Sequence, residues 1–304
     1  MSKLRIYALA TRPWAFPAAI IPVLLGGVVA VTHANVQLNG FHYILTLLTA
    51  VIVQGASNTM NDIFDVRKGV DRPGIEGSSR GMYVMGLMSQ REVVVETIIL
   101  WALAAASAVY FVIRIGPMLL PLILGGFVLG FGYTLTPTVW KYRGLGDLCV
   151  FGAFGVGLTL GSYVVQTGTY SWVPVAYSIP IAILIAAILH GNNLRDIASD
   201  RAEDIRTLAM MLGERRGRIL YLYQISAAYL IVVVLAVSRI AVWSALLPLL
   251  SLPLGLRAMR GAWPRLVGGT MPREGIINLD MRTAQLQMVF GLLLILGTLA
   301  PALF

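Results

Sequence analysis

Nine apolar stretches limit what this chain of 304 residues can fold into. Each is long enough, or nearly long enough, to cross about 30 Å of hydrocarbon as a helix. They lie near 13–32, 41–61, 93–113, 117–137, 148–165, 172–190, 219–238, 240–256 and 285–303. The eighth is short and contains Pro248 and Pro253, so we expect a kinked or tilted helix there. Only 12% of the residues are charged, about half of the share in soluble proteins, so the chain is predicted to be an all-α polytopic membrane protein with nine transmembrane helices.

The basic residues predict how the chain is oriented. Of the 23 Lys and Arg, 21 lie in the N-terminus and in every second connection, and only Arg114 and Arg239 lie on the other side. Cytoplasmic loops retain Lys and Arg, so we expect a cytoplasmic N-terminus in the cell membrane and, with an odd number of helices, Phe304 on the opposite side. The net charge of +9 favours lipid headgroups and anionic substrates over nucleic acid, which would need a soluble basic face. Cys149, the one cysteine, is expected to be a small core residue.

Two rows of polar side chains follow apolar stretches. In the first row, Asn58, Asp62 and Asp65 stand at i, i+4 and i+7, and they share one face if the helix continues that far. The second row contains Asp196 and Asp200. A single aspartate of this kind could be a helix cap or half of a surface salt bridge. Two matched rows at the edge of the hydrocarbon instead indicate a functional site that needs a cation.

The residue types in the rows favour Mg²⁺. This ion prefers oxygen ligands and is usually held by one or two carboxylates plus the phosphate oxygens of a substrate. Zinc and copper sites normally contain His or Cys, which both rows lack. We therefore predict that Asp62, Asp65, Asp196 and Asp200 are catalytic, with a diphosphate held by Mg²⁺ between the rows. The predicted metal ligands are Asn58, Asp62, Asp65, Asp196 and Asp200.

Basic residues beside the rows are candidates for direct contact with the diphosphate. Each one could alternatively be an anchor among lipid headgroups. The predicted set, with Tyr133 added because it precedes Lys141 by eight positions, is Arg12, Lys68, Arg72, Tyr133, Lys141, Arg143 and Arg195. His190 precedes the second row and is either a base or a structural residue. The connections near 66–92 and 197–218 are predicted to cap a polar cavity, the alternative being solvated loops.

These residues resemble the UbiA superfamily of intramembrane aromatic prenyltransferases. The first row matches its N-x-x-x-D-x-x-D pattern and the second matches D-x-x-x-D. Within the superfamily the chain is most similar to the branch that prenylates 1,4-dihydroxy-2-naphthoate. The similar stretches are 11–18, 22–26, 61–71, 142–147, 161–168 and 192–200. Two positions depart from the pattern: Asp204-Ile205 replaces a common Gly-Lys, and Asp147 stands where Glu is usual.

The resemblance implies one prenyltransferase domain over 1–304, with nine helices around a central cavity. It implies Mg²⁺ dependence, a polyprenyl diphosphate donor, and 1,4-dihydroxy-2-naphthoate as an acceptor that loses CO₂ in menaquinone biosynthesis. The equivalent placement of the rows also suggests related halves, 13–137 and 148–256, followed by 285–303.

Two alternatives remain from the residues alone. The acceptor could be 4-hydroxybenzoate, homogentisate or a glycerol phosphate ether. The rows could also form the ion pathway of a cation transporter. Transporter acids usually lie near the middle of the bilayer on broken helices, whereas these rows lie at helix ends, which favours the enzyme.

Overall fold

The computed structural model describes residues 1–69, 81–135, 137–203, 205–264, 266 and 271–302, and this part of the chain is helical. Its α-helices are α1 (Lys3–Ala10), α2 (Pro17–Ala34), α3 (Gly40–Arg67), α4 (Gln90–Ile115), α5 (Leu120–Thr134), α6 (Gly146–Val150), α7 (Leu158–Thr167), α8 (Trp172–Ala202), α9 (Leu208–Leu212), α10 (Glu214–Val237), α11 (Leu252–Ala262) and α12 (Leu279–Leu299). A π-helical stretch, η4 (Phe151–Gly157), joins α6 to α7. The 3₁₀ segments are η1 (Pro13–Ala15), η2 (Pro117–Leu119), η3 (Trp140–Tyr142), η5 (Trp243–Ser251) and η6 (Ala300–Ala302).

Among the described residues, eight helical segments are long and apolar enough to cross a membrane. The chain is therefore a multi-pass membrane protein, although the expected count of nine is not reached. The difference lies in the eighth stretch, which forms the 3₁₀ segment η5 followed by the short helix α11. Pro248 and Pro253 each lack the backbone N–H that a continuous α-helix would use there.

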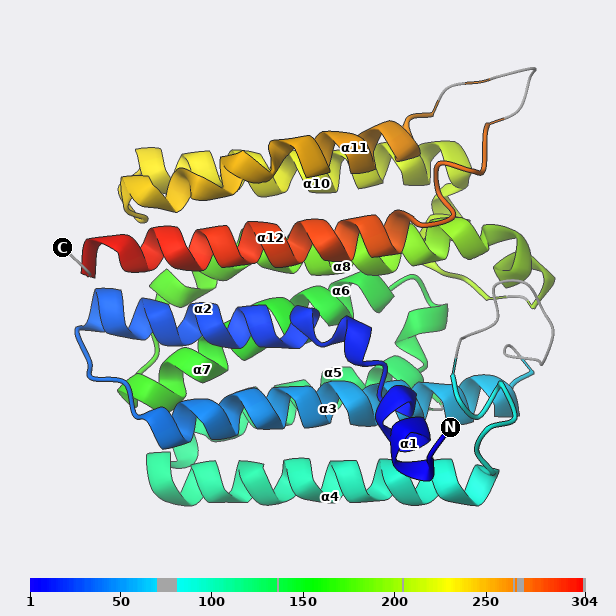
Figure 1. The fold of residues 1–304 in the computed structure, drawn as a ribbon, viewed down its shortest axis with the longest axis horizontal. Helices are drawn as coiled ribbons and strands as arrows, with labels where there is room; N and C mark the ends of the chain where they lie inside the picture. The colour runs from blue at the N-terminus through cyan, green and yellow to red at the C-terminus, as the bar shows by residue number, and fades with distance from the viewer. Residues whose placement is uncertain (70–80, 136, 204, 265, 267–270, 303–304) are drawn as a thin grey trace.

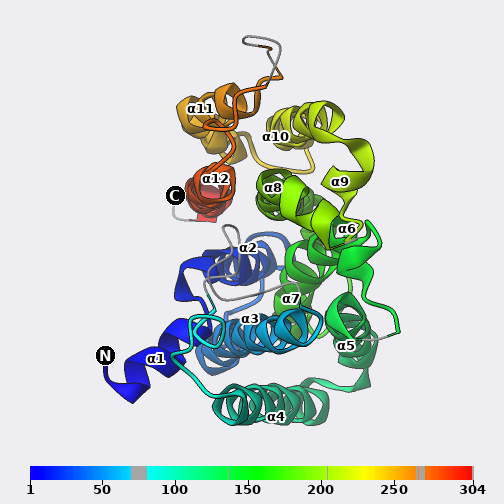
Figure 2. The same ribbon diagram turned by 90° about the vertical axis from the view of Figure 1, so that its right-hand side faces the viewer.

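The long helices lie side by side along the longest axis of the molecule (Figure 1), with α4 at one edge and α10 and α11 at the other. Figure 2 shows the same helices end on. Helices α2 and α7 pack closely at Gly26, which has no Cβ. A Cβ at this position would overlap the backbone of Thr159 in α7. Beside it, the Ser162 hydroxyl donates to the Val23 carbonyl at 2.8 Å. The main core joins α2, α7, α8, α10 and α12.

The two rows are carried by the two longest helices. Helix α3 has 28 residues and α8 has 31. At 1.5 Å per residue they are about 42 and 46 Å long, so each extends beyond about 30 Å of hydrocarbon. Helix α3 continues to Arg67, so Asn58, Asp62 and Asp65 lie on one helix as the spacing required. The C-terminal ends of α3 and α8 lie at the same end of the bundle (Figure 1).

A small second core holds the end of α3 in place. It consists of Ala10, Ile63, Met82, Met88 and Val93, which come from α1, α3, the segment 81–89 and α4. Helix α4 starts with a capping box, in which the Ser89 side chain and Glu92 bond to each other's backbone N–H groups. These contacts fix the segment 81–89 beside the first row. The rest of the expected cap, 70–80, lies outside the described residues.

Candidate active site

Asp62, in the middle of the first row, is fully buried and forms an ion pair with Arg12. Arg12 lies between α1 and η1 with a φ of 56°, in the left-handed region that a residue with a side chain rarely adopts. Backbone strain of this kind is found mainly where the surrounding structure enforces it at functional sites. Gly81 packs so closely against Asp62 that a Cβ at this position would overlap the carboxylate. Asn58, also buried, donates from its side-chain amide to the Thr11 carbonyl at 2.9 Å.

Asp65, the last residue of the first row, is held by the segment that follows α5. The Lys141 ammonium lies 2.5 Å from an Asp65 carboxylate oxygen, and the Tyr142 hydroxyl donates to the same oxygen. Lys141 is only 8% exposed, and its charge also lies 5.8 Å from the centre of the Tyr133 ring and 4.9 Å from that of Tyr142. The Asp65 carboxylate and the faces of both aromatic rings attract the positive charge of the Lys141 ammonium. The structure thus joins the predicted residues Asp65, Lys141 and Tyr133 in one cluster.

The other basic candidates near the first row differ in position. Lys68 lies over the Tyr142 ring at 5.1 Å. Partial burial and the nearby charge of Lys141 lower the pKa of Lys68, while the charge of Asp65 opposes this shift. Arg143 is exposed, and its guanidinium donates to the Pro137 carbonyl at 2.8 Å. Arg72 lies outside the described residues.

The second row is organised by Arg195, on the same helix. Its Nε and Nη2 atoms each lie 2.8 Å from a different oxygen of Asp196, a bidentate contact. Its Nη1 atom donates to Asp280 at 2.8 Å, and Nη2 also donates to Asn192 at 2.6 Å. In this structure the Arg195 guanidinium therefore pairs with the carboxylates of Asp196 and Asp280. Asp200 accepts a hydrogen bond of 3.1 Å from the Thr207 hydroxyl.

The helix ends that carry the two rows lie at the same end of the bundle (Figure 1), and the charge of Asp65 acts on Asp200. Within the described residues, three acidic, His or Cys side chains do not gather closely enough to hold a metal ion alone. The donor set nevertheless fits Mg²⁺, because it consists of carboxylate and amide oxygens, and Mg²⁺ usually needs only one or two carboxylates when a phosphate supplies further oxygens.

Several residues in the cluster were not expected from the sequence. Tyr142 was missed although it follows Lys141 directly. Asn61 accepts hydrogen bonds from Lys141, at 3.3 Å, and from Thr134. Asp280 comes from α12, and the sequence contains no spacing signal to link it to Arg195. Glu96 of α4 interacts electrostatically with Asp62, and its Oε2 atom is buried without a hydrogen-bond partner in the described part of the chain.

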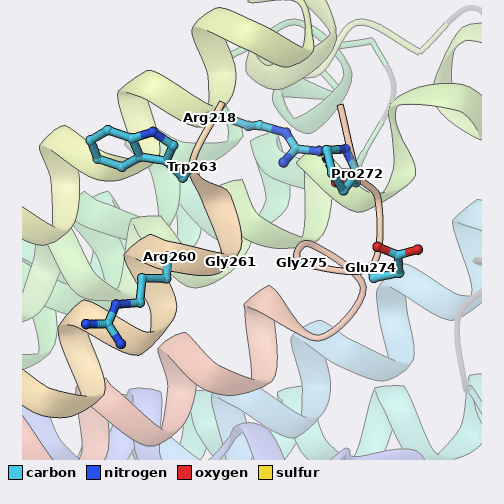
Figure 3. Close-up of a pocket in the computed structure, with 7 residues that line it drawn as sticks. All are labelled: Arg218, Arg260, Gly261, Trp263, Pro272, Glu274 and Gly275. Atoms are coloured by element: carbon cyan, nitrogen blue, oxygen red, sulfur yellow. Dashed lines mark hydrogen bonds between the residues drawn. The ribbon is translucent and has the colours of Figure 1, made fainter. Parts of the chain in front are cut away.

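A separate pocket of about 290 Å³ lies at the start of α10 and the end of α11 (Figure 3). Arg218, only 1% exposed, points across it toward Pro272 and donates to the Pro272 carbonyl at 2.7 Å. Arg218 also pairs with Glu214 at 2.5 Å. These contacts tie the first turn of α10 to the segment before α12. None of the predicted site residues lines this pocket.

The chain is similar to known proteins over nearly its whole length. UbiA prenyltransferase domain-containing protein 1 of Xenopus tropicalis is 33% identical over 304 residues, which cover 99% of this chain and 84% of that protein. The human protein of the same name is also 33% identical over 304 residues, covering 99% and 85%.

Solved structures show the same fold. A UbiA homolog from Archaeoglobus fulgidus bound to GPP and Mg²⁺ superimposes with a TM-score of 0.66 at 19% identity, covering 95% of this chain and 99% of that one. The apo structure of a UbiA homolog from Aeropyrum pernix K1 gives a TM-score of 0.66 at 17% identity, covering 99% of both chains. The model of the UbiA prenyltransferase family matches residues 19–268. The chain belongs to the UbiA prenyltransferase family and is a prenyltransferase.

Proposed function

We propose that this prenyltransferase moves a polyprenyl group from polyprenyl diphosphate to 1,4-dihydroxy-2-naphthoate, with loss of CO₂ from the acceptor. The reaction depends on Mg²⁺ and takes place at the cytoplasmic face of the cell membrane. The proposed metal ligands are those predicted from the sequence, Asn58, Asp62, Asp65, Asp196 and Asp200. Mg²⁺ would neutralise charge on the diphosphate and so make it a better leaving group.

The pairing of each aspartate with a polar partner is the observation that carries this proposal. Arg12 holds Asp62, Lys141 and Tyr142 hold Asp65, Arg195 holds Asp196, and Thr207 holds Asp200. Cations and carboxylates gathered in this way can accept a metal and an anion together, because the carboxylates then bind the metal and the cations bind the phosphate oxygens. Arg12 and Lys141 would orient the diphosphate. The ring faces of Tyr133 and Tyr142 lie beside the positive charge of Lys141.

The choice of acceptor rests on sequence, chiefly on the stretches 161–168 and 192–200. The alternatives are 4-hydroxybenzoate, homogentisate and a glycerol phosphate ether. The last is supported by the fold of digeranylgeranylglyceryl phosphate synthase, which matches with a TM-score of 0.65 at 16% identity over 99% of this chain. The transporter alternative has no comparable support.

The proposal includes a ninth membrane span beside the eight long helical segments. Segments η5 and α11 follow one another from Trp243 to Ala262, and together they would form the ninth span. With nine spans, the termini lie on opposite sides, and the N-terminus and the ends of α3 and α8 face the cytoplasm, as the basic residues predict. The chain would then form a single domain around a central cavity.

An assay with purified protein tests the proposal. The protein in detergent is given radiolabelled polyprenyl diphosphates of several lengths, each of the four acceptors, and either Mg²⁺ or EDTA. We expect prenylated, decarboxylated naphthoate only with Mg²⁺, and we expect Asp62→Ala to abolish product while the protein stays folded. Glu274→Gln, outside both rows, is the matched control and should remain active.

Each other outcome has a defined meaning. Transfer to a different acceptor would overturn the naphthoate assignment and leave the site intact. Retained turnover in Asp62→Ala or in EDTA would overturn the proposed site. Cation flux into proteoliposomes without any prenyl donor would support a transport activity instead.

A further inference from the structure

His190 is a fully buried residue of α8 that the reaction scheme above does not use. Its Nδ1 atom lies 2.9 Å from Oδ2 of Asp147 in α6, and its Nε2 atom lies 3.0 Å from the Gly217 carbonyl oxygen in α10. The other oxygen of Asp147 lies 3.4 Å from the Asn193 side-chain amide, one turn after His190. One imidazole therefore connects three separate helices.

The hydrogen-bond partners of His190 limit how many protons the His190–Asp147 pair can carry. A carbonyl oxygen can only accept a hydrogen bond, and so can an ionised carboxylate. A neutral imidazole has a single N–H, so one of its two contacts would bring two lone pairs together. Leaving such a contact unsatisfied in a buried site is expensive. Asp147 and His190 must therefore share two protons, which makes the pair electrically neutral as a whole.

The surroundings place both protons on the histidine. Asp147 lies at the N-terminus of the helical span Gly146–Thr167, where free N–H groups and the helix dipole favour a negative charge. Asn193 donates to the same carboxylate, which also favours its ionised form. Other polar groups nearby include Tyr133 of α5, which interacts with Asp147, and Arg218 of α10, which donates to Glu214 and to the Pro272 carbonyl. Figure 3 shows the Arg218 side chain pointing toward Pro272.

We propose that His190 is an imidazolium ion and a positioning residue for the second row. Asp196 follows it by six residues, about 9 Å along the helix axis. Holding α8 to α6 and α10 at His190 fixes the direction and rotation of the last turns of α8, which carry Asp196 and Asp200. The Arg195–Asp280 ion pair holds the same turns to α12. The effect on catalysis rests on the proposed function of this row, whereas the protonation state of His190 does not.

Nitrogen-15 NMR tests the protonation state without any assay of activity. The chain has three histidines, His33, His42 and His190, so a spectrum of protein labelled at histidine is simple, and His190→Leu identifies one set of signals by its loss. At neutral pH we expect both ring nitrogens of His190 to show directly bonded protons. A ring nitrogen without a proton at neutral pH would overturn the proposal, even if the enzyme assay succeeds.

Three variants test the positioning role. Asp147→Asn is the matched change, because its amide can donate to Nδ1 of a neutral His190 while Nε2–H still donates to Gly217. We expect this variant to stay active, with an Mg²⁺ concentration for half-maximal activity close to that of the natural protein. Asp147→Ala and His190→Leu remove the connection, and we expect the Mg²⁺ concentration for half-maximal activity to rise about tenfold or more.

The outcomes separate the proposals. An inactive but folded Asp147→Asn would contradict a positioning ion pair. Unchanged Mg²⁺ dependence in folded Asp147→Ala would do the same. If the natural protein shows no prenyl transfer while the NMR result holds, only the proposed function fails.

Discussion

At the scale of single residues, each carboxylate of the site already has a partner of opposite charge or a hydroxyl donor. The closest example is Asp65, where Lys141 is 8% exposed and lies 2.5 Å from the carboxylate. Buried pairs of this kind add little net stability, but removing one partner leaves an uncompensated charge in a place that water reaches poorly. The pair is therefore suited to exchange its partners when a ligand of matching charge arrives.

Replacing Lys141 by Met should strongly reduce activity and stability, because it removes a cation proposed to bind the diphosphate and leaves the Asp65 carboxylate uncompensated. Loss of one partner of a buried pair costs about 3–5 kcal/mol. We expect a lower melting temperature and a loss of kcat/KM of about a hundredfold or more. Lys141→Arg should recover part of the activity, and Lys3→Met, which changes an exposed lysine, serves as the control. Near-normal kcat/KM in Lys141→Met would exclude a role in binding diphosphate.

Lys68 gives a prediction about pH. Its pKa is lowered by burial and by Lys141, so as pH rises Lys68 loses its charge earlier than an ordinary lysine does. The attraction for diphosphate should fall over the same range, and KM for the prenyl diphosphate should rise. In Lys68→Arg the charge persists to higher pH, so this increase in KM should be smaller. Parallel KM profiles for the two proteins would show that Lys68 does not contact the substrate.

At the scale of elements, the segment 81–89 packs closely against α3 at Asp62. The fit depends on Gly81, since a Cβ there would overlap the carboxylate. Next to Asp62 along α3, Ile63 packs with Ala10, Met82 and Met88 in the small second core. The segment therefore cannot move away from Asp62 without exposing apolar side chains.

Gly81→Ala should displace either the segment or Asp62. Forcing an extra methyl group into a packed site costs about 1–3 kcal/mol, and we expect activity to fall more than thermal stability does. Gly125→Ala is the control, because a Cβ at Gly125 in α5 meets no atom within 4 Å. Equal activity in the two variants would show that Gly81 has no close contact with the carboxylate during turnover.

At the scale of the whole molecule, the site combines segments from both halves of the sequence, so a ligand should stabilise the entire bundle. A ligand at one hundred times its Kd stabilises a folded protein by about 2.7 kcal/mol. We expect Mg²⁺ with inorganic pyrophosphate to raise the melting temperature by several degrees in the natural protein and hardly at all in Asp62→Ala. An equal rise in both proteins would place the ligand elsewhere.

The sequence predicted most of the long helices and the positions of both rows along them, because apolar length and helical spacing are local properties. It could not predict which partner each charge would choose. Asp280 meets Arg195 only because α12 packs against α8, and the loops between them carry no signal of that contact. The eighth stretch was predicted as a full span, but its two prolines divide it into η5 and α11. Cys149 is buried and free, as expected.

The great length of α3 and α8 has a consequence for the choice of host lipid. Both helices are longer than a membrane span by about ten residues, and this extra length places their charged ends outside the hydrocarbon. In a bilayer of lipids with longer acyl chains, the hydrocarbon layer would extend closer to those charged ends. The helices would then have to tilt less, or the bilayer would have to thin around them. Acyl-chain length is thus tied directly to how easily water reaches the carboxylates at the ends of these helices.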